Sequence, residues 1–314
     1  MLTKNINFKN FSIKSNTSKV KKNFQILLKQ NLKLINSLKN SYKYSYKKKL
    51  ILELRKFSNI RIIGMGGSIL GAEAIYEFLK DKIRKNFLFI NNLRTNPNNF
   101  NNKNKVLNLI ISKSGNTLET ISNANIIIKK KDKNIFITEN KNSYLTNLAK
   151  KLESEIVEHK NFIGGRYSVL SEVGMLPAEL MGLNEKKFKQ FNNLVKSKRF
   201  VNSLIANVSS TLELLKKGKF TSIILNYDES SNNFFKWYQQ LIAESLGKNA
   251  KGILPVISTM PKDNHSLMQL YLDGNKNSFF TFFDVKNNNS PKINKKKIFG
   301  SYKYLKKHNL LSVK

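Results

Sequence analysis

The chain has 314 residues, 40% of them hydrophobic, which is enough for a substantial core in one large domain or two of ordinary size. It has no cysteine, which excludes disulfides and thiolate chemistry. It has no run of about 18 apolar residues, so no membrane-spanning helix is expected, and its N-terminus lacks the apolar centre of a signal peptide. The net charge of +36 comes from scattered lysines interleaved with Asn and Ile, which favours a solvated surface over a nucleic-acid footprint. We therefore expect a cytoplasmic protein without specific nucleic-acid binding and without membrane association.

The N-terminal segment, residues 1–50, is Lys-rich, and its apolar residues recur at a spacing near 3.6. This pattern predicts one or two surface helices. In residues 51–184, short apolar runs then alternate with helical stretches. These runs are Ile60 to Ile63, FLFI, VLNLIIS and NIFIT, and the stretches LGAEAIYEFLK and TLETISNANIIIKK lie among them. The alternation predicts a parallel sheet covered on both faces.

A second α/β unit is predicted over residues 185–314. A helical linker near 185–217 leads into it. The same alternation then returns in TSIILNY, NNFFKWYQQLIAESLG, GILPVIS, HSLMQLYLDG and SFFTFFDV. Residues 286–298 have the composition of an exposed loop. The second unit is shorter than the first.

A glycine-rich turn, residues 64–68, follows the first apolar run and precedes a helical stretch. Glycines at such a place let backbone N–H groups approach an anion at a helix N-terminus. A dinucleotide turn is not predicted, because Ile69 stands at the third glycine position of G-x-G-x-x-G and no acidic residue ends the next strand. The P-loop Lys-Ser/Thr pair is missing too. On its own, the turn is either an anion site or a structural turn.

A second polar turn, residues 112–117, follows another apolar run and again precedes a helix. Its hydroxyls, its amide and the N–H groups of the helix start can form a neutral cradle for a phosphate dianion. The alternative is an ordinary helix N-cap at Thr117. Successive parallel strands end at one edge of a sheet, where open α/β proteins bind ligands. The two turns together therefore favour a phosphorylated small molecule.

Five segments in series resemble the phosphoglucose isomerase family of sugar isomerase (SIS) domain proteins. They are GMGGSILG, SKSGNTLET, NFIGGRYSVLS, WYQQLIAESLGK and DNHSLMQLYLDG, of which the third is similar to the family signature. The resemblance implies two SIS-type α/β units with parallel sheets, the second incomplete. It also implies a cofactor-free, metal-free enzyme that interconverts glucose 6-phosphate and fructose 6-phosphate through a cis-enediol.

This aldose–ketose isomerisation needs a base that moves a proton between C1 and C2, a cation beside the enediolate and groups that open the sugar ring. The resemblance implies Glu244 as the base, Arg166 as the cation and His265 as the ring-opening residue. In this family that histidine is contributed across a homodimer interface. The resemblance also implies a buried acidic position near the site at Glu119. It implies hexose-phosphate contacts at Gly67, Ser68, Ser112, Lys113, Ser114, Thr117, Gly165 and Gln240.

Each of the three central residues also has a simpler interpretation. Glu244 could be neutralised by Lys248 on a surface helix. Arg166 could form a structural salt bridge, and His265, at the apparent start of a helix, could be structural or a cap. Gln240 lies four residues before Glu244 and hence on the same helical face. No pair of histidines has metal-ligand spacing.

Two features depart from the family pattern. The family's later segment with a ring-opening lysine is not found, since Lys306, Lys307 and Lys314 lack the required neighbours. Glu172 occupies a signature position usually taken by a small residue. The missing lysine keeps open a non-catalytic sugar-phosphate-binding protein. Isomerisation of a related sugar phosphate, such as mannose 6-phosphate, is a further alternative.

Overall fold

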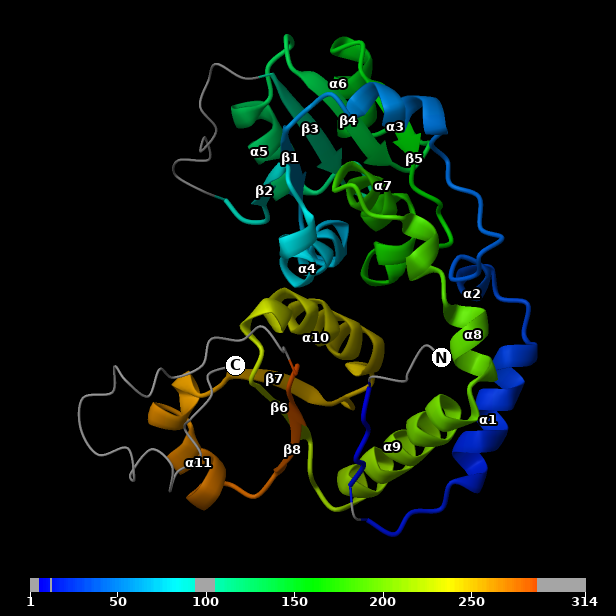
Figure 1. Cartoon of the computed structure of the whole chain (residues 1–314), viewed down its shortest axis with the longest axis vertical. Helices are drawn as coiled ribbons and strands as arrows, with labels where there is room; N and C mark the ends of the chain where they lie inside the picture. The colour runs from blue at the N-terminus through cyan, green and yellow to red at the C-terminus, as the bar shows by residue number, and fades with distance from the viewer. Residues whose placement is uncertain (1–5, 12, 94–104, 287–314) are drawn as a thin grey trace, which may run out of the picture.

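The computed structural model describes residues 6–11, 13–93 and 105–286. Within these residues the chain forms two parallel sheets, each with helices around it (Figure 1). The first sheet has the strand order β2-β1-β3-β4-β5, and the second has the order β7-β6-β8. The predicted α/β class with two parallel-sheet units is therefore confirmed.

The first sheet consists of the predicted apolar runs and one further strand. Its strands are β1 (Asn59–Gly64), β2 (Asn86–Ile90), β3 (Val106–Ile111), β4 (Lys133–Thr138) and β5 (Glu155–Glu158). Every residue of β1 and β3 is buried, as expected for central strands covered on both faces. Gly64 pairs with Ile111 at the ends of these two strands. The glycine-rich turn (64–68) and the polar turn (112–117) therefore leave the sheet at the same edge.

Alternate residues of the central strands contribute to separate cores on the two faces of the sheet. Ile60 and Ile62 join the core that includes α3 (Lys48–Leu54), α4 (Leu70–Phe78) and α7 (Glu172–Leu180). Ile63 joins the core with α5 (Leu118–Ile127) and α6 (Tyr144–Lys151). This follows from the two-residue period of a strand.

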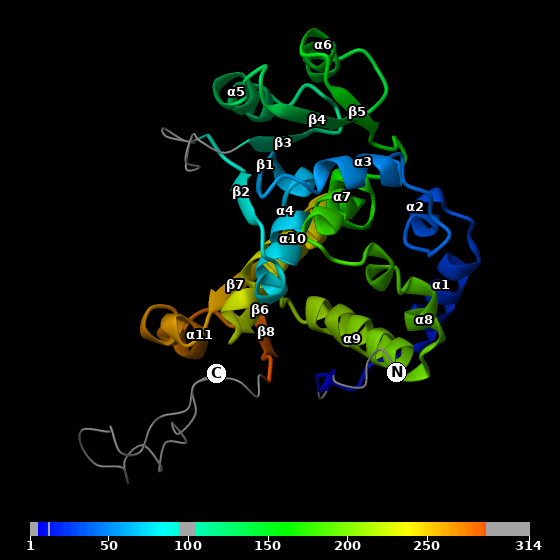
Figure 2. The same cartoon turned by 45° about the horizontal axis from the view of Figure 1, so that its top comes forward.

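The N-terminal segment contains helices, as its periodicity predicts. They are α1 (Ser18–Lys29), α2 (Lys33–Asn36) and the start of α3. No residue of α1 is buried, so it is a surface helix. It lies beside α9 (Lys198–Lys216) of the linker (Figures 1 and 2).

The predicted linker is helical and consists of η4 (Glu185–Phe188), α8 (Phe191–Lys196) and α9. The second unit follows with β6 (Thr221–Asn226), α10 (Asn232–Leu246), β7 (Leu254–Thr259), α11 (Met268–Asp273) and β8 (Ser278–Phe283). The loop expected over 286–298 lies, from residue 287 onward, outside the described residues. Among the described helices, none is long and apolar enough to cross a membrane.

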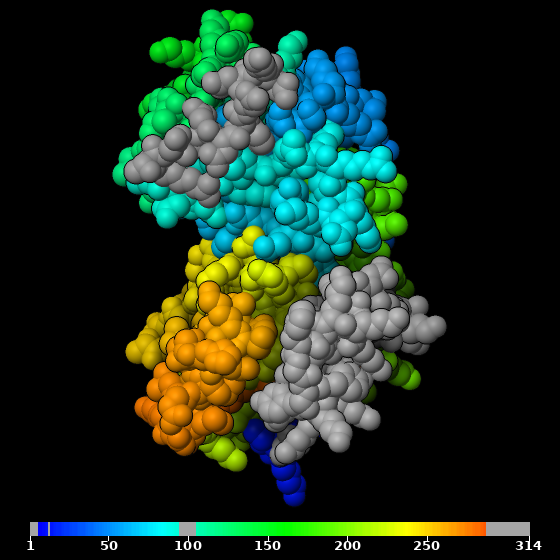
Figure 3. Space-filling model, turned by 60° about the vertical axis from the view of Figure 1, so that its left-hand side comes forward, coloured from blue at the N-terminus to red at the C-terminus, as the bar shows by residue number. Residues whose placement is uncertain are grey.

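Helix α10 packs against α4 of the first unit and so joins the two halves of the molecule. Figure 3 shows the two lobes meeting where the cyan surface of the first unit abuts the yellow surface of the second. The Glu77 carboxylate of α4 accepts a hydrogen bond from the backbone N–H of Asn233 at the start of α10, at 3.0 Å. This bond caps α10, since its own N-cap residue Ser231 makes no side-chain cap. The helix that carries Glu244 is thus anchored on the first unit.

Candidate active site

The first glycine turn, η1 (Gly66–Ser68), allows two other segments to approach it closely. Gly66 has φ of +52°, a conformation that favours glycine, and a Cβ there would lie 2.9 Å from Nε2 of Gln240 on α10. A Cβ on Gly67 would lie 2.2 Å from the carbonyl carbon of Gly165. Neither position can accept a side chain without displacement of its neighbour. The turn is therefore packed against both α10 and the signature segment.

The signature segment forms η3 (Gly165–Leu170), and its buried serine fixes it on the glycine turn. Ser168 Oγ donates to the carbonyl oxygen of Gly165 at 2.7 Å and lies 3.1 Å from that of Gly67. Arg166 stands at the start of this segment with 21% of its side chain exposed. The predicted contact residues Gly67, Ser68 and Gly165 thus lie together, with Arg166 beside them.

Glu244, Arg166 and Gln240 form one connected group. Arg166 Nη1 lies 3.2 Å from Glu244 Oε2, and Gln240 Nε2 donates to Glu244 Oε1 at 2.8 Å. Gln240 and Glu244 share a helical face, as their spacing predicts. The salt bridge considered for Arg166 exists, but its partner is the predicted base, and Lys248 is not the cation that pairs with Glu244. A half-exposed carboxylate (48%) therefore sits between a cation and an amide at the junction of the two units.

Three further residues support Arg166. Its Nε donates to Ser245 Oγ at 3.0 Å, its guanidinium carbon lies 4.5 Å from the Tyr167 ring centroid, and Trp237 Nε1 donates to its carbonyl oxygen at 3.0 Å. Burial lowers the pKa of Arg166, but Tyr167 and Glu244 outweigh it, so the net shift of this pKa is upward. Sequence reasoning did not assign these roles, although all three residues lie in segments that resemble the family.

The second polar turn is ordered by its own hydroxyls. Ser112 Oγ lies 2.8 Å from Thr117 Oγ1 and accepts from the Gly115 N–H at 3.2 Å, while Ser114 Oγ accepts from the Asn116 N–H at 3.1 Å. Thr117 is the N-cap residue of α5, as the alternative expected, but its side chain makes no capping hydrogen bond. The turn is preformed beside the glycine turn at the edge of the sheet.

Lys113 connects this second turn to the signature segment. Its Nζ donates to the carbonyl oxygen of Asn161 at 2.8 Å and lies 3.6 Å from the Glu139 carboxylate. Glu119 is half-buried in the first turn of α5.

The structure does not bring His265 into contact with Glu244 or Arg166. It is exposed, and no hydrogen bond or ion pair of its side chain forms within residues 6–11, 13–93 and 105–286. The expected helix start at His265 is wrong: His265 ends the short turn η6 (Lys262–His265), and α11 begins at Met268. Asp263 ties this turn to β7 by accepting from the Thr259 N–H at 2.7 Å.

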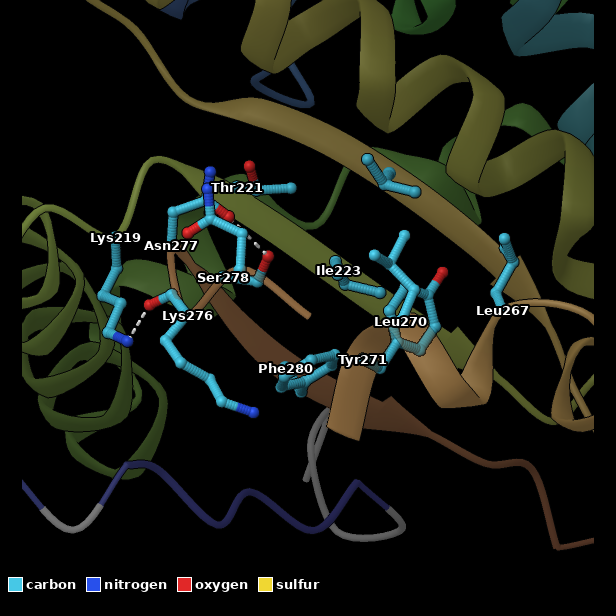
Figure 4. A pocket seen from close by; sticks show the side chains of 12 residues that line it. Lys219, Thr221, Ile223, Leu267, Leu270, Tyr271, Lys276, Asn277, Ser278 and Phe280 are labelled. Carbon is cyan, nitrogen blue, oxygen red and sulfur yellow. Dashed lines mark hydrogen bonds between the residues drawn. The ribbon is translucent and has the colours of Figure 1, made fainter. Parts of the chain in front are cut away.

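The second unit contains a cavity of about 470 Å³ (Figure 4). Thr221 and Ser278, the first residues of β6 and β8, line it together with apolar residues of α11 such as Leu270 and Tyr271. It is therefore at the amino edge of the second sheet, whereas open parallel sheets bind ligands at the carboxyl edge. None of the predicted site residues lines it.

Comparison with known proteins identifies the family. The family model described as phosphoglucose isomerase matches residues 10–262 of this chain. The chain belongs to the phosphoglucose isomerase family. In the described part of this family member, no group of three or more His, Asp or Glu side chains could hold a metal ion.

Two curated relatives carry the name glucose-6-phosphate isomerase. The protein from Methanocaldococcus jannaschii is 37% identical over 256 residues, covering 74% of this chain and 61% of that protein. The protein from Acholeplasma laidlawii is 34% identical over 258 residues, covering 72% of this chain and 59% of that protein. The chain thus spans about three-fifths of the length of these relatives.

Solved structures share the fold. A hypothetical protein from Thermus thermophilus superposes with a TM-score of 0.71 at 19% identity, covering 95% of this chain and 76% of that chain. A glucose-6-phosphate isomerase from Chlamydia trachomatis superposes with a TM-score of 0.58 at 21% identity, covering 74% of this chain and 51% of that chain. At these identities, the likeness establishes the fold alone.

Proposed function

We propose that this member of the phosphoglucose isomerase family interconverts glucose 6-phosphate and fructose 6-phosphate through a cis-enediol. The observation that carries the proposal is the Glu244 carboxylate held between Arg166 Nη1 at 3.2 Å and Gln240 Nε2 at 2.8 Å, beside the glycine turn. A carboxylate next to a fixed cation and an anion-binding turn is suited to enolisation of a sugar phosphate.

Glu244 acts as the base in this proposal. It removes the C2 proton of the open-chain aldose, and the electron pair of that bond moves toward C1, whose carbonyl oxygen gains negative charge. Arg166 stabilises the resulting enediolate because its charge is permanent. The hydroxyl proton of C2 passes to the C1 oxygen, so that the negative charge now lies on the C2 oxygen. Glu244 then returns its proton to C1 on the same face, and the C2 oxygen becomes the carbonyl of the ketose.

The phosphate is assigned to the two turns at the edge of the first sheet. Backbone N–H groups of the glycine turn and the Ser112, Ser114 and Thr117 hydroxyls offer donors to a dianion. Gln240, whose amide packs on Gly66, contributes from α10. Lys113 supplies positive charge from the second turn.

Ring opening is assigned to His265 of a second subunit. The support is that His265 is exposed and forms no hydrogen bond or ion pair within the described residues. The homodimer and the shared histidine are part of the proposal, as is a cytoplasmic location, which follows from the proposed reaction of central sugar metabolism.

Glu244→Gln tests the base. The substitution keeps the shape and the contact with Gln240 but removes the proton acceptor, so exchange of the C2 proton with solvent should fall by about 10³-fold or more. Exchange is measured by NMR in deuterated buffer with glucose 6-phosphate and, separately, with mannose 6-phosphate. Glu229→Gln, at an exposed position in the short helix η5 (Glu229–Ser231) that precedes α10, is the matched control and should exchange at the wild-type rate.

The outcomes separate the alternatives. Binding of hexose phosphate by the wild-type protein without exchange or turnover would replace the isomerase with a non-catalytic binding protein. Exchange that survives in Glu244→Gln at the wild-type rate would remove Glu244 as the base. Faster exchange with mannose 6-phosphate than with glucose 6-phosphate would change the assigned substrate.

A further inference from the structure

Ser245 directly follows Glu244 on α10 and contacts Arg166 and Tyr167, the second and third residues of η3. Its Oγ accepts a hydrogen bond from Arg166 Nε at 3.0 Å and lies 2.7 Å from the Tyr167 hydroxyl. Successive residues of one helix therefore contact Arg166 at two different nitrogens, since Nη1 faces Glu244. Because the guanidinium is planar and rigid, two such contacts fix its plane.

The remaining contacts of Arg166 leave one edge of the guanidinium open. The Tyr167 ring lies against it at 4.5 Å, and Trp237 holds its backbone carbonyl. The hydrogen bonds to Ser245 and Glu244 use Nε and Nη1. Nη2 takes part in neither bond, and we assign it as the donor to an anionic oxygen of a substrate.

We propose that Ser245 is a positioning residue: it orients Arg166 toward the developing enediolate, and Tyr167 in turn orients Ser245. The inference deepens the proposed isomerase function and rests on it. It adds a role for a side chain that does not itself touch the reacting atoms.

Loss of the Ser245 hydroxyl is expected to slow the chemical step. Negative charge on the enediolate oxygen is fully developed only near the transition state, so a misaligned Arg166 costs rate more than it costs substrate binding. A Ser245→Ala chain keeps Glu244, Arg166 and the helix intact, because alanine is a good helix former. Arg166 then loses the acceptor for Nε and can rotate.

Steady-state kinetics of the full chain test this role. Ser245→Ala should lower kcat about tenfold with KM within about twofold of wild type, and Ser245→Thr, which restores the hydroxyl, should recover most of kcat. Tyr167→Phe should show a smaller loss of the same kind. An unchanged kcat in Ser245→Ala, or a Ser245→Thr variant as slow as the alanine variant, overturns the proposal.

A titration provides a readout that does not need activity. Burial raises the pKa of Tyr167, but its hydrogen bonds with Ser245 and Arg166, together with the charges of Arg166 and Lys248, outweigh it and lower this pKa below its ordinary value. Ser245→Ala should therefore raise the pH at which Tyr167 ionises. The signal is the phenolate absorbance difference between each protein and the same protein carrying Tyr167→Phe.

The two readouts separate failure of this proposal from failure of the proposed function. A wild-type protein without isomerase activity defeats the proposed function, and the titration of Tyr167 then still tests its contact with Ser245. A Tyr167 titration midpoint that Ser245→Ala leaves unchanged overturns the positioning role. An active wild type, together with a Ser245→Ala variant whose Tyr167 midpoint is shifted and whose kcat is reduced, supports both proposals.

Discussion

The two sheets differ in how far their strands are buried. All residues of β1 and β3 in the first sheet are buried, whereas β7 and β8 of the second expose Leu254 (62%) and Phe282 (70%) within the described part of the chain. The first sheet has a core on each face. In the second, the buried cluster around Ile223 is smaller.

This contrast assigns different tasks to the two units. The first sheet is a rigid frame, and both polar turns emerge from its most buried strands, where backbone movement is most restricted. The second unit contributes Glu244, Gln240 and Ser245 through a single helix that is capped by Glu77 of the first unit. The site geometry therefore depends on the first sheet and on the contact between α4 and α10.

The largest predicted effect tests the burial difference directly. Leu109→Ala removes a side chain that is 0% exposed at the centre of the first sheet and should lower the free energy of unfolding by about 3–4 kcal/mol. Phe282→Ala, on the exposed edge of β8, should change it by about 0.5 kcal/mol or less. Urea unfolding followed by circular dichroism measures both. Comparable losses in the two variants would mean that the second sheet is as well packed as the first.

Much of the fold could be predicted from hydrophobic pattern. The largely apolar runs around Ile62 and Leu109 became central strands because a strand covered on both faces is nearly continuously apolar, and here every residue of both strands is buried. β5 (Glu155–Glu158) was missed because its edge position leaves a short, charged segment with little periodicity. The helix start expected at His265 was wrong because Asp263 bonds back to β7 and closes a tight turn first.

The site was predictable only where one segment contained the pattern. The glycine and polar turns were found because glycine and hydroxyl residues between a strand and a helix have a direct physical meaning. The Gln240–Glu244 pair followed from helical spacing. The contacts of Arg166 with Ser245 and Tyr167 were not predicted, because residues about 80 positions apart meet only through the packing of α10 on the first unit.

The second prediction concerns a buried carboxylate in the first unit. Glu172 is 0% exposed and accepts hydrogen bonds from the Tyr42 hydroxyl at 3.0 Å and from the backbone N–H of Ser45 at 2.9 Å. It therefore ties the N-terminal segment to the start of α7, six residues after Arg166. Glu172, which stands where the family signature usually has a small residue, thus has hydrogen-bond donors of its own in Tyr42 and Ser45.

Glu172→Ala leaves these buried donors unpaired and should reduce stability by about 3 kcal/mol. The matched control is Glu213→Ala on α9, whose surface pair with Lys216 at 2.8 Å is worth about 0.5 kcal/mol or less. Thermal unfolding of both variants at one pH gives the comparison. Equal losses of stability in Glu172→Ala and Glu213→Ala would mean that the buried carboxylate contributes no more than the surface one.

The third prediction concerns the buried ammonium group of Lys189, which lies beside Tyr42 and is attracted by the charge of Glu172. Lys189 is 4% exposed, donates to the carbonyl oxygens of Ser37 and Leu170, and lies 4.5 Å from the ring centroid of Tyr42. Burial lowers its pKa to about 8, although the charge of Glu172 opposes the shift. The charged form is therefore disfavoured in the folded protein relative to the unfolded chain, whose lysine has the ordinary pKa of 10.5.

The sign of the pH dependence follows from this difference. Between the two pKa values the unfolded chain holds more protons, so the contribution of Lys189 to stability rises with pH, by about 2 kcal/mol from about pH 7 to about pH 9.5. Urea midpoints of wild type and Lys189→Met, taken across this range, isolate the contribution because the other titrating groups are common to both. Lys186→Met, at an exposed position three residues away, should parallel wild type. A constant difference between wild type and Lys189→Met would place the folded-state pKa at its ordinary value, and Lys189 would then be solvated rather than held in the buried network that fixes the N-terminal segment to the signature.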